Sequence, residues 1–147
     1  MSNPATGPLR LHAALVHFPV AAWSGAVLLR LSLRLGDAAT LWSVDTAAAT
    51  AVLIWLGLGS AAIAAAAGLV EYSALPAGEP LLRHAMQHMR WIGVAVTCFL
   101  LLGLDQGGSG PRLPPPVQDL LFALGAVALF AGAHRGGRLV VLRYRTR

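Results

Sequence analysis

Long apolar runs separated by short polar stretches dominate this chain. Four runs are long enough to cross a bilayer as helices, and they cover residues 11–33, 47–70, 86–104 and 117–133. The stretches between them are rich in the glycine and proline residues that end helices. A segment in lipid must satisfy its own backbone hydrogen bonds, so each run is expected to be a helix. The pattern predicts an all-α fold, an integral membrane up-and-down four-helix bundle made by one domain over residues 1–147.

The first run begins unusually, because His12, His17 and Pro19 all fall within its first nine residues. The residue before a proline avoids helical geometry, so Phe18 is expected to mark the start of the long helix. The two histidines would then lie on a preceding half-turn or short interfacial helix. On a continuous helix their five-residue spacing would turn them about 140° apart, so only one of them is expected to face the bundle.

Small residues concentrate in the second run, where Gly57 and Gly59 are followed by Ser60, Ala61, Ala62 and the segment 64–68. Such residues allow a neighbouring helix to approach closely. No polar stripe accompanies them, so this run is interpreted as a packing surface rather than a channel lining.

Composition and charge agree with membrane insertion. The chain is 56% hydrophobic and 12% charged, whereas soluble domains average about one-quarter charged residues. The net charge of +5 would suit a nucleic-acid binder only if the arginines formed one patch. They flank the apolar runs instead, eight on the side of the termini and three on the other. By the positive-inside rule, both termini are expected in the cytoplasm, with the lipid bilayer and not nucleic acid as the partner.

An even number of spans brings all five histidines to the same end of the bundle. They occur at the start of the first run, at the start of the third and at the end of the fourth, together with Glu71 at the end of the second. The candidate cofactor-binding residues are therefore His12, His17, His84, His88 and His134. Ionisable side chains that converge inside a membrane bundle are functional candidates by default, although a single interfacial histidine often only hydrogen-bonds to headgroups or backbone.

Two kinds of centre are compatible with this cluster. His84 and His88 are four residues apart on one helix face and can bind one metal ion together, with Glu71 as a further ligand or as an orienting acceptor. Both imidazoles approach from the same side, so they cannot be the two axial ligands of one haem. A bis-histidine haem would need one of this pair and a histidine from a facing helix, such as His17 or His134.

Motifs of common enzyme classes are absent from the sequence. It contains no P-loop, nucleophile elbow, paired carboxylates or CxxC motif, so no catalytic activity is expected of the chain on its own. Cys98 lies inside an apolar run and is expected to be a small buried hydrophobe.

Four motifs resemble a family of small bacterial membrane proteins catalogued as domain of unknown function 2231. His12 with Val16-His17-Phe18-Pro19-Val20 is similar to its H-x-x-x-V-H-F-P-I opening, and the other motifs are Gly68–Glu71, His84–His88 and His134–Val140. The chain departs from the family pattern at Glu71, which replaces the usual aspartate, at Arg135, which replaces an aromatic residue, and at Val141, which replaces a frequent tyrosine.

The resemblance implies a four-helix protein of the bacterial inner membrane whose relatives are sometimes joined to cytochrome c or Rieske-type iron–sulfur domains. It therefore implies electron transfer, with haem b bound by the histidines and with cytochrome c or iron–sulfur proteins as redox partners. Three functions remain open at this level: a b-type haem or quinone-linked electron-transfer subunit, a binder of a transition-metal ion, or an assembly subunit that holds no cofactor. A homo-oligomer is compatible with each.

Overall fold

The computed structural model describes residues 11–36, 45–73, 80–108 and 113–145, with side chains described except at 80–81 and 140–145. Its elements are α1 (Leu11–Leu15), α2 (His17–Leu35), α4 (Thr46–Ser73), α5 (Pro80–Gln106) and α6 (Pro115–Arg145). Within these ranges no strand occurs, which confirms the all-α prediction. Four helical segments are long and apolar enough to cross a membrane, and they are Leu11–Leu35, Thr46–Ser73, Leu82–Gln106 and Pro115–Leu139.

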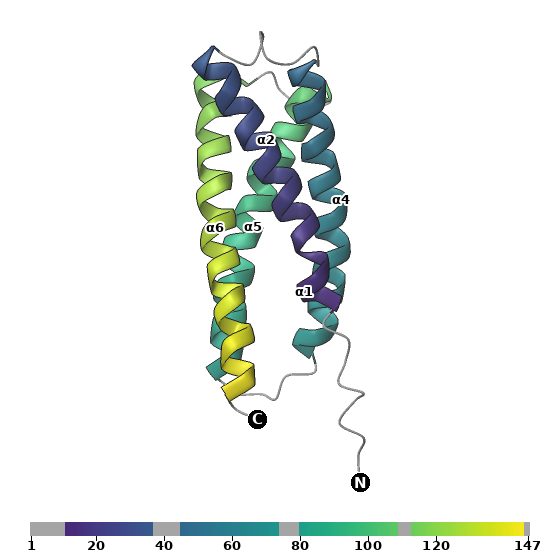
Figure 1. Ribbon diagram of the computed structural model, residues 1–147, viewed down its shortest axis with the longest axis vertical. Coiled ribbons are helices and arrows are strands. Elements are labelled where there is room, and N and C mark those ends of the chain that lie inside the picture. Colours follow the sequence, from purple (N-terminus) through teal and green to yellow (C-terminus); the bar gives the residue numbers. More distant parts are fainter. Residues whose placement is uncertain (1–10, 37–44, 74–79, 109–112, 146–147) are drawn as a thin grey trace.

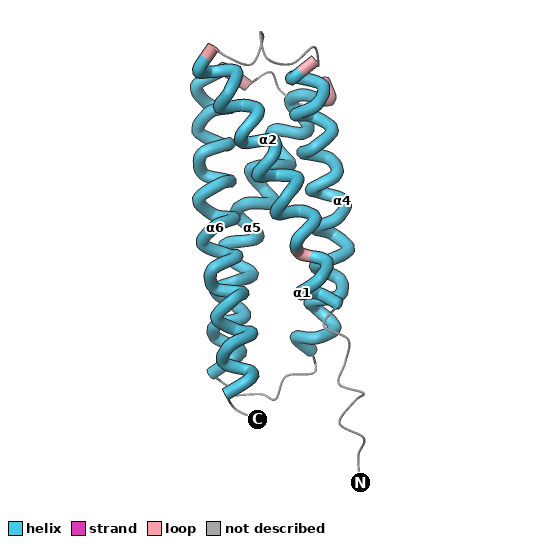
Figure 2. The backbone as a smooth tube through the Cα atoms, in the orientation of Figure 1, coloured by secondary structure: helices cyan, strands magenta, loops and turns pink. Residues whose placement is uncertain are grey.

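The helices run up and down and pair as two hairpins (Figures 1 and 2). The α2 helix packs along α4, and α5 packs along α6 over a still longer contact. Further contacts of α4 with α5, and of α2 with α6, close the bundle. The start of α1, the end of α4, the start of α5 and the end of α6 share one end of the molecule, called here the histidine end (Figure 1).

Local sequence signals set most of the helix boundaries. Asp45 caps α4, since its Oδ1 accepts the N–H groups of Ala47 and Ala48 at 3.0 and 3.1 Å. Both α5 and α6 begin with a proline, whose missing N–H is not needed in a first turn. Gly36, at φ 82°, ends α2 in the left-handed conformation that glycine adopts without strain.

The junction between α1 and α2 lies close to where the sequence placed it. A five-residue helix precedes the long one, as predicted, but α2 begins at His17, one residue before Phe18. Pro19 in the first turn has no N–H to donate to the Leu15 carbonyl, so the helical ladder is interrupted there. Val16 between the two helices keeps right-handed helical angles. His17 therefore belongs to α2 and His12 to α1.

Two helices extend well beyond the predicted runs. The α5 helix starts at Pro80 rather than residue 86, and it continues to Gln106. The α6 helix runs from Pro115 through the segment 134–137, which the sequence had suggested as its end, to Arg145. The apolar pattern underestimated both helices because polar residues and glycines continue a helix readily where a neighbouring helix packs against them.

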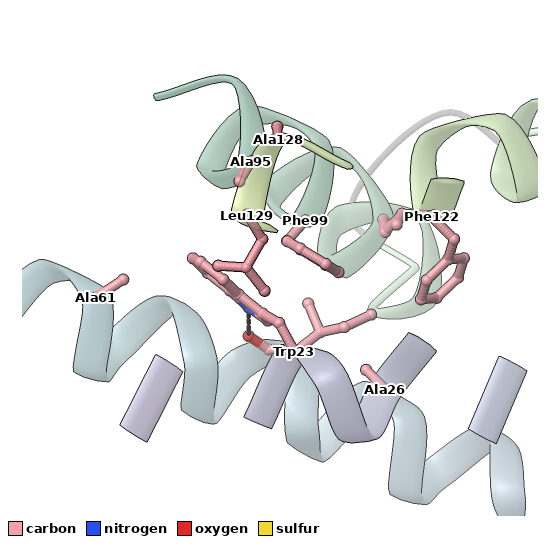
Figure 3. Close-up of a cluster of buried hydrophobic side chains, with 10 residues drawn as sticks. Trp23, Ala26, Ala61, Ala95, Phe99, Phe122, Ala128 and Leu129 are labelled. Carbon is pink, nitrogen blue, oxygen red and sulfur yellow. Dashed lines mark hydrogen bonds between the residues drawn. The ribbon is translucent and has the colours of Figure 1, made fainter. Parts of the chain in front are cut away.

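Aromatic stacking fills the middle of the bundle (Figure 3). Trp23 of α2 lies parallel to Phe99 of α5, with ring centroids 4.7 Å apart, and Phe99 meets Phe122 of α6 edge to face at 6.4 Å. The Trp23 indole N–H donates to the Ile54 carbonyl of α4 at 3.3 Å. Trp23 thus contacts two other helices of the bundle, α5 through stacking and α4 through a hydrogen bond.

The end opposite the histidines is joined by polar interactions. Arg30 and Arg34 of α2 both pair with Asp119 of α6, at 2.8 and 2.6 Å. Asp105 is buried at the end of α5. Its carboxylate accepts the Leu113 N–H at 2.7 Å and the side-chain amide of Gln118 at 2.9 Å, which compensates for its burial.

Candidate functional site

Buried stripes with alternating steps of three and four residues lead from the core to the histidine end. On α5 the stripe passes from Leu102, Phe99 and Ala95 to Ile92 and reaches His88. On the first span the same spacing runs from Ala26, Trp23 and Pro19 back to His12. On α4 it runs through Gly57, Ala61, Ala64 and Gly68 to Glu71. The core stripe of each of these elements therefore ends in an ionisable side chain.

His12 is held against α4. Its Nδ1 lies 2.7 Å from the carbonyl oxygen of Ala64, one turn before Gly68. The ring occupies the space that a side chain at Gly68 would need, since a Cβ there would come within 2.8 Å of His12 Nδ1. The absence of a side chain at Gly68 therefore lets α1 lie against α4 with the imidazole between them.

His88 is held against α6 in the same manner. Its Nδ1 lies 2.7 Å from the carbonyl oxygen of Gly132. A Cβ at Gly136, one turn further along α6, would come within 3.1 Å of the His88 ring. Each of the two imidazoles thus lies in a space left by a glycine and is bound to a backbone carbonyl one turn earlier on the neighbouring helix.

The two rings lie close to each other across the bundle. The centroids of His12 and His88 are 6.2 Å apart, and the ring planes are nearly perpendicular at 83°. A carbonyl oxygen only accepts hydrogen bonds, so Nδ1 of each ring must carry the proton. In the neutral imidazole, Nε2 is then the atom with the free lone pair, which is the tautomer that a metal ligand requires.

The remaining histidines are placed differently. His17 is exposed, and its Nδ1 lies 3.2 Å from the Ala14 carbonyl, within its own segment. His134 is also exposed, whereas His84 is half-buried one turn before His88. Only one of His12 and His17 was expected to face the bundle, and that residue is His12. The facing-helix partner of His88 is thus His12, and neither His17 nor His134 takes that place.

A metal site of three protein ligands is not formed by these residues. In the parts of the chain that the structure describes, no group of three histidine, cysteine, aspartate or glutamate side chains could hold a metal ion. Glu71 is half-buried with its Oε1 shielded from solvent, but it does not form such a group with His84 and His88. Cys98 is buried, in agreement with its apolar surroundings.

Sequence reasoning missed the glycines and carbonyls that hold the two rings. Gly68 and Gly136 look like ordinary packing residues in the sequence, and the carbonyls of Ala64 and Gly132 leave no mark in it. One signal was present. Trp23 and Pro19 are four residues apart, and His12 lies seven residues before Pro19, which is one further step of three and one of four. His17, two residues before Pro19, does not fit this spacing.

Comparisons of the chain with family models, with curated proteins and with solved structures gave no match. The likeness to the domain of unknown function 2231 family stays a prediction from the motifs. Functional inference for this chain consequently rests on the geometry of its own side chains.

Proposed function

We propose that the protein is a small electron-transfer subunit of the bacterial inner membrane that binds one b-type haem through His12 and His88. The observation that supports this proposal is the opposed pair of imidazoles, 6.2 Å apart between centroids, with each Nδ1 bound to a carbonyl of a neighbouring helix. Haem b is bound by a pair of histidines from facing helices, and these residues supply that donor set.

The spacing of the two rings suits a shared metal. With metal–imidazole bonds of about 2.0–2.1 Å, two rings whose centroids are 6.2 Å apart are close enough to hold one metal ion between them. Gly68 and Gly136 leave room for the rings, because a Cβ at either position would enter the space of the imidazole. His12 and His88 are therefore the residues that would hold the haem iron.

The chain's own groups would set the properties of such a centre. The carbonyls of Ala64 and Gly132 would hold the rings in one orientation and leave each Nε2 lone pair to bind a metal. The apolar core that begins with Ile92 and Ala95 limits the access of water from the middle of the bundle. The haem, when bound, supplies one-electron redox chemistry.

Absorption spectra of purified variants test the proposal. Protein produced in haem-replete cells should show a Soret band that shifts on dithionite reduction. His12→Ala and His88→Ala should each lose the six-coordinate spectrum, and added imidazole should restore it in part. The matched controls His17→Ala and His134→Ala remove exposed histidines at the same end of the bundle and should leave the spectrum unchanged.

Two outcomes would contradict the haem assignment. One is a colourless wild-type preparation from haem-replete cells, and the other is a spectrum that persists in His12→Ala and His88→Ala. Elemental analysis of the same samples identifies the alternative, a transition-metal ion without porphyrin. If a metal ion binds without porphyrin, His12 and His88 are better candidate ligands than Glu71 with His84 and His88. Among the described residues, His12 and His88 are the histidines whose rings meet across helices.

A further inference from the structure

A second site lies on the outer side of the α5–α6 hairpin. A hollow of about 360 Å³ is lined by Gln87, Arg90, Trp91, Val94 and Arg135. The α5 residues follow the spacing of one helix face, which is turned about 100° from the face that carries His88. The hollow is thus separate from the His12–His88 pair, and nothing in the proposed electron-transfer function uses it.

The lining combines positive charge with apolar surface. Two of the five lining residues are arginines and none is a carboxylate. The Arg135 guanidinium donates a hydrogen bond to the Gln87 side chain, which connects α6 to α5 at the edge of the hollow. Trp91 and Val94, 37% and 47% exposed, add apolar surface beside the charges. A ligand that fits both features is an anion with an apolar portion.

The hollow also lies at a defined depth. Arg135 follows Asp119 on α6 by 16 residues, which is about 24 Å of helix. Arg90 precedes Asp105 on α5 by 15 residues. No arginine, lysine, aspartate or glutamate occurs between the members of either pair. These apolar lengths are somewhat shorter than the hydrocarbon thickness of about 30 Å, so in an inserted bundle Arg90 and Arg135 would lie near the level of the lipid headgroups, with Trp91 beside them.

We propose that this hollow binds an anionic phospholipid from the membrane leaflet at the histidine end. The phosphate lies between the guanidinium groups of Arg90 and Arg135, and an acyl chain follows Trp91 and Val94 toward the middle of the bundle. Charge complementarity selects the anionic headgroup, and the exposed apolar residues select a lipid over a free anion. The proposal rests on membrane insertion and is independent of any cofactor.

Lipid titration of the detergent-purified full chain, followed by native mass spectrometry, tests the proposal. Wild-type protein should bind phosphatidylglycerol in preference to phosphatidylcholine. Each basic residue near a charged lipid surface contributes about fivefold in binding, so Arg90→Gln with Arg135→Gln should weaken phosphatidylglycerol binding by about 25-fold. Replacement of both residues by lysine keeps the charge and should retain most of the binding. Arg83→Gln with Arg138→Gln, a matched pair of exposed arginines outside the hollow, should bind as wild type does.

Three results would overturn the lipid assignment. The first is equal binding of phosphatidylglycerol and phosphatidylcholine, and the second is unchanged binding by the Arg90→Gln, Arg135→Gln protein. The third is occupation of the site by inorganic phosphate with no gain from an acyl chain, which would identify a free-anion site. Native mass spectrometry reports the bound lipid, and helical circular dichroism reports whether each variant is folded. Neither measurement depends on whether haem is bound.

Discussion

The imidazoles of His12 and His88 lie edge to face with their centroids 6.2 Å apart, although 76 residues separate them in the chain. Each ring is bound to a different neighbouring helix, His12 to α4 and His88 to α6. The pair therefore connects the two hairpins of the bundle at one end. At the other end Arg30, Arg34 and Asp119 connect α2 to α6 through charge.

The glycines that receive the two rings should be sensitive to a single methyl group. Gly68→Ala places a Cβ 2.8 Å from His12 Nδ1, so the ring must move and its bond to Ala64 must lengthen. We expect a loss of about 1–3 kcal/mol in the free energy of unfolding, the usual range for overpacking. Thermal unfolding in detergent, followed by circular dichroism, measures it.

Gly59→Ala is the matched control on the same helix, because a Cβ there meets nothing within 4 Å. Alanine is the better helix former by about 0.8–1.0 kcal/mol, so this variant should be as stable as wild type or more stable. If Gly68→Ala unfolds at the same temperature as Gly59→Ala, His12 is not held against α4 as described.

A methyl group at Gly57 should disturb the aromatic core. Its Cβ would lie 2.2 Å from Trp23 Nε1, and the indole cannot retreat because Phe99 stacks on it at 4.7 Å. Gly57→Ala is expected to destabilise the bundle by about 1–3 kcal/mol or more and to change the near-ultraviolet circular dichroism of Trp23. Adding Trp23→Phe, which replaces the indole with a smaller phenyl ring, should restore part of the stability. Equal stability of the single and double variants would contradict this contact.

The buried carboxylate of Asp105 should contribute to stability through the two donors that it satisfies. Asp105→Ala leaves the Leu113 N–H and one interaction of the Gln118 amide without an acceptor. We expect a loss of about 1–3 kcal/mol in the free energy of unfolding. Gln106→Ala changes the adjacent, exposed residue and should have little effect. In a double-mutant cycle, Gln118→Ala should cost less in the Asp105→Ala background than in wild type, and strict additivity would argue against the bond.

The orientation in the membrane is open to a direct test. The sequence predicts eight arginines on the side of the termini and three on the other, so the histidine end is expected to face the cytoplasm. With buried Cys98 replaced by alanine, Ser73→Cys and Gln106→Cys place exposed thiols at opposite ends of the bundle. An impermeant maleimide should label Gln106→Cys in intact spheroplasts and Ser73→Cys only after lysis. The reverse pattern would place the histidines outside.

Much of the fold could be predicted from the sequence because its signals are local. Apolar runs of sufficient length imply helices, and an even number of them brings both chain ends, and all five histidines, to one end. Pro19 was correctly associated with a short helix before a long one, since a missing N–H acts within a single turn. The extension of α6 through Gly136 and Gly137 was not predictable from these signals, because it depends on packing against α5.

The histidine site divides between sequence and tertiary structure in the same way. The sequence by itself determined which residue types are at the histidine end, and the spacing of His12 and His17 predicted that only one of them faces the bundle. Only the tertiary structure decided that His12 meets His88, since that pairing depends on which helices become neighbours. It also decided that the carbonyls of Ala64 and Gly132 hold the rings. Every residue has a carbonyl, and only packing determines which one a distant side chain reaches.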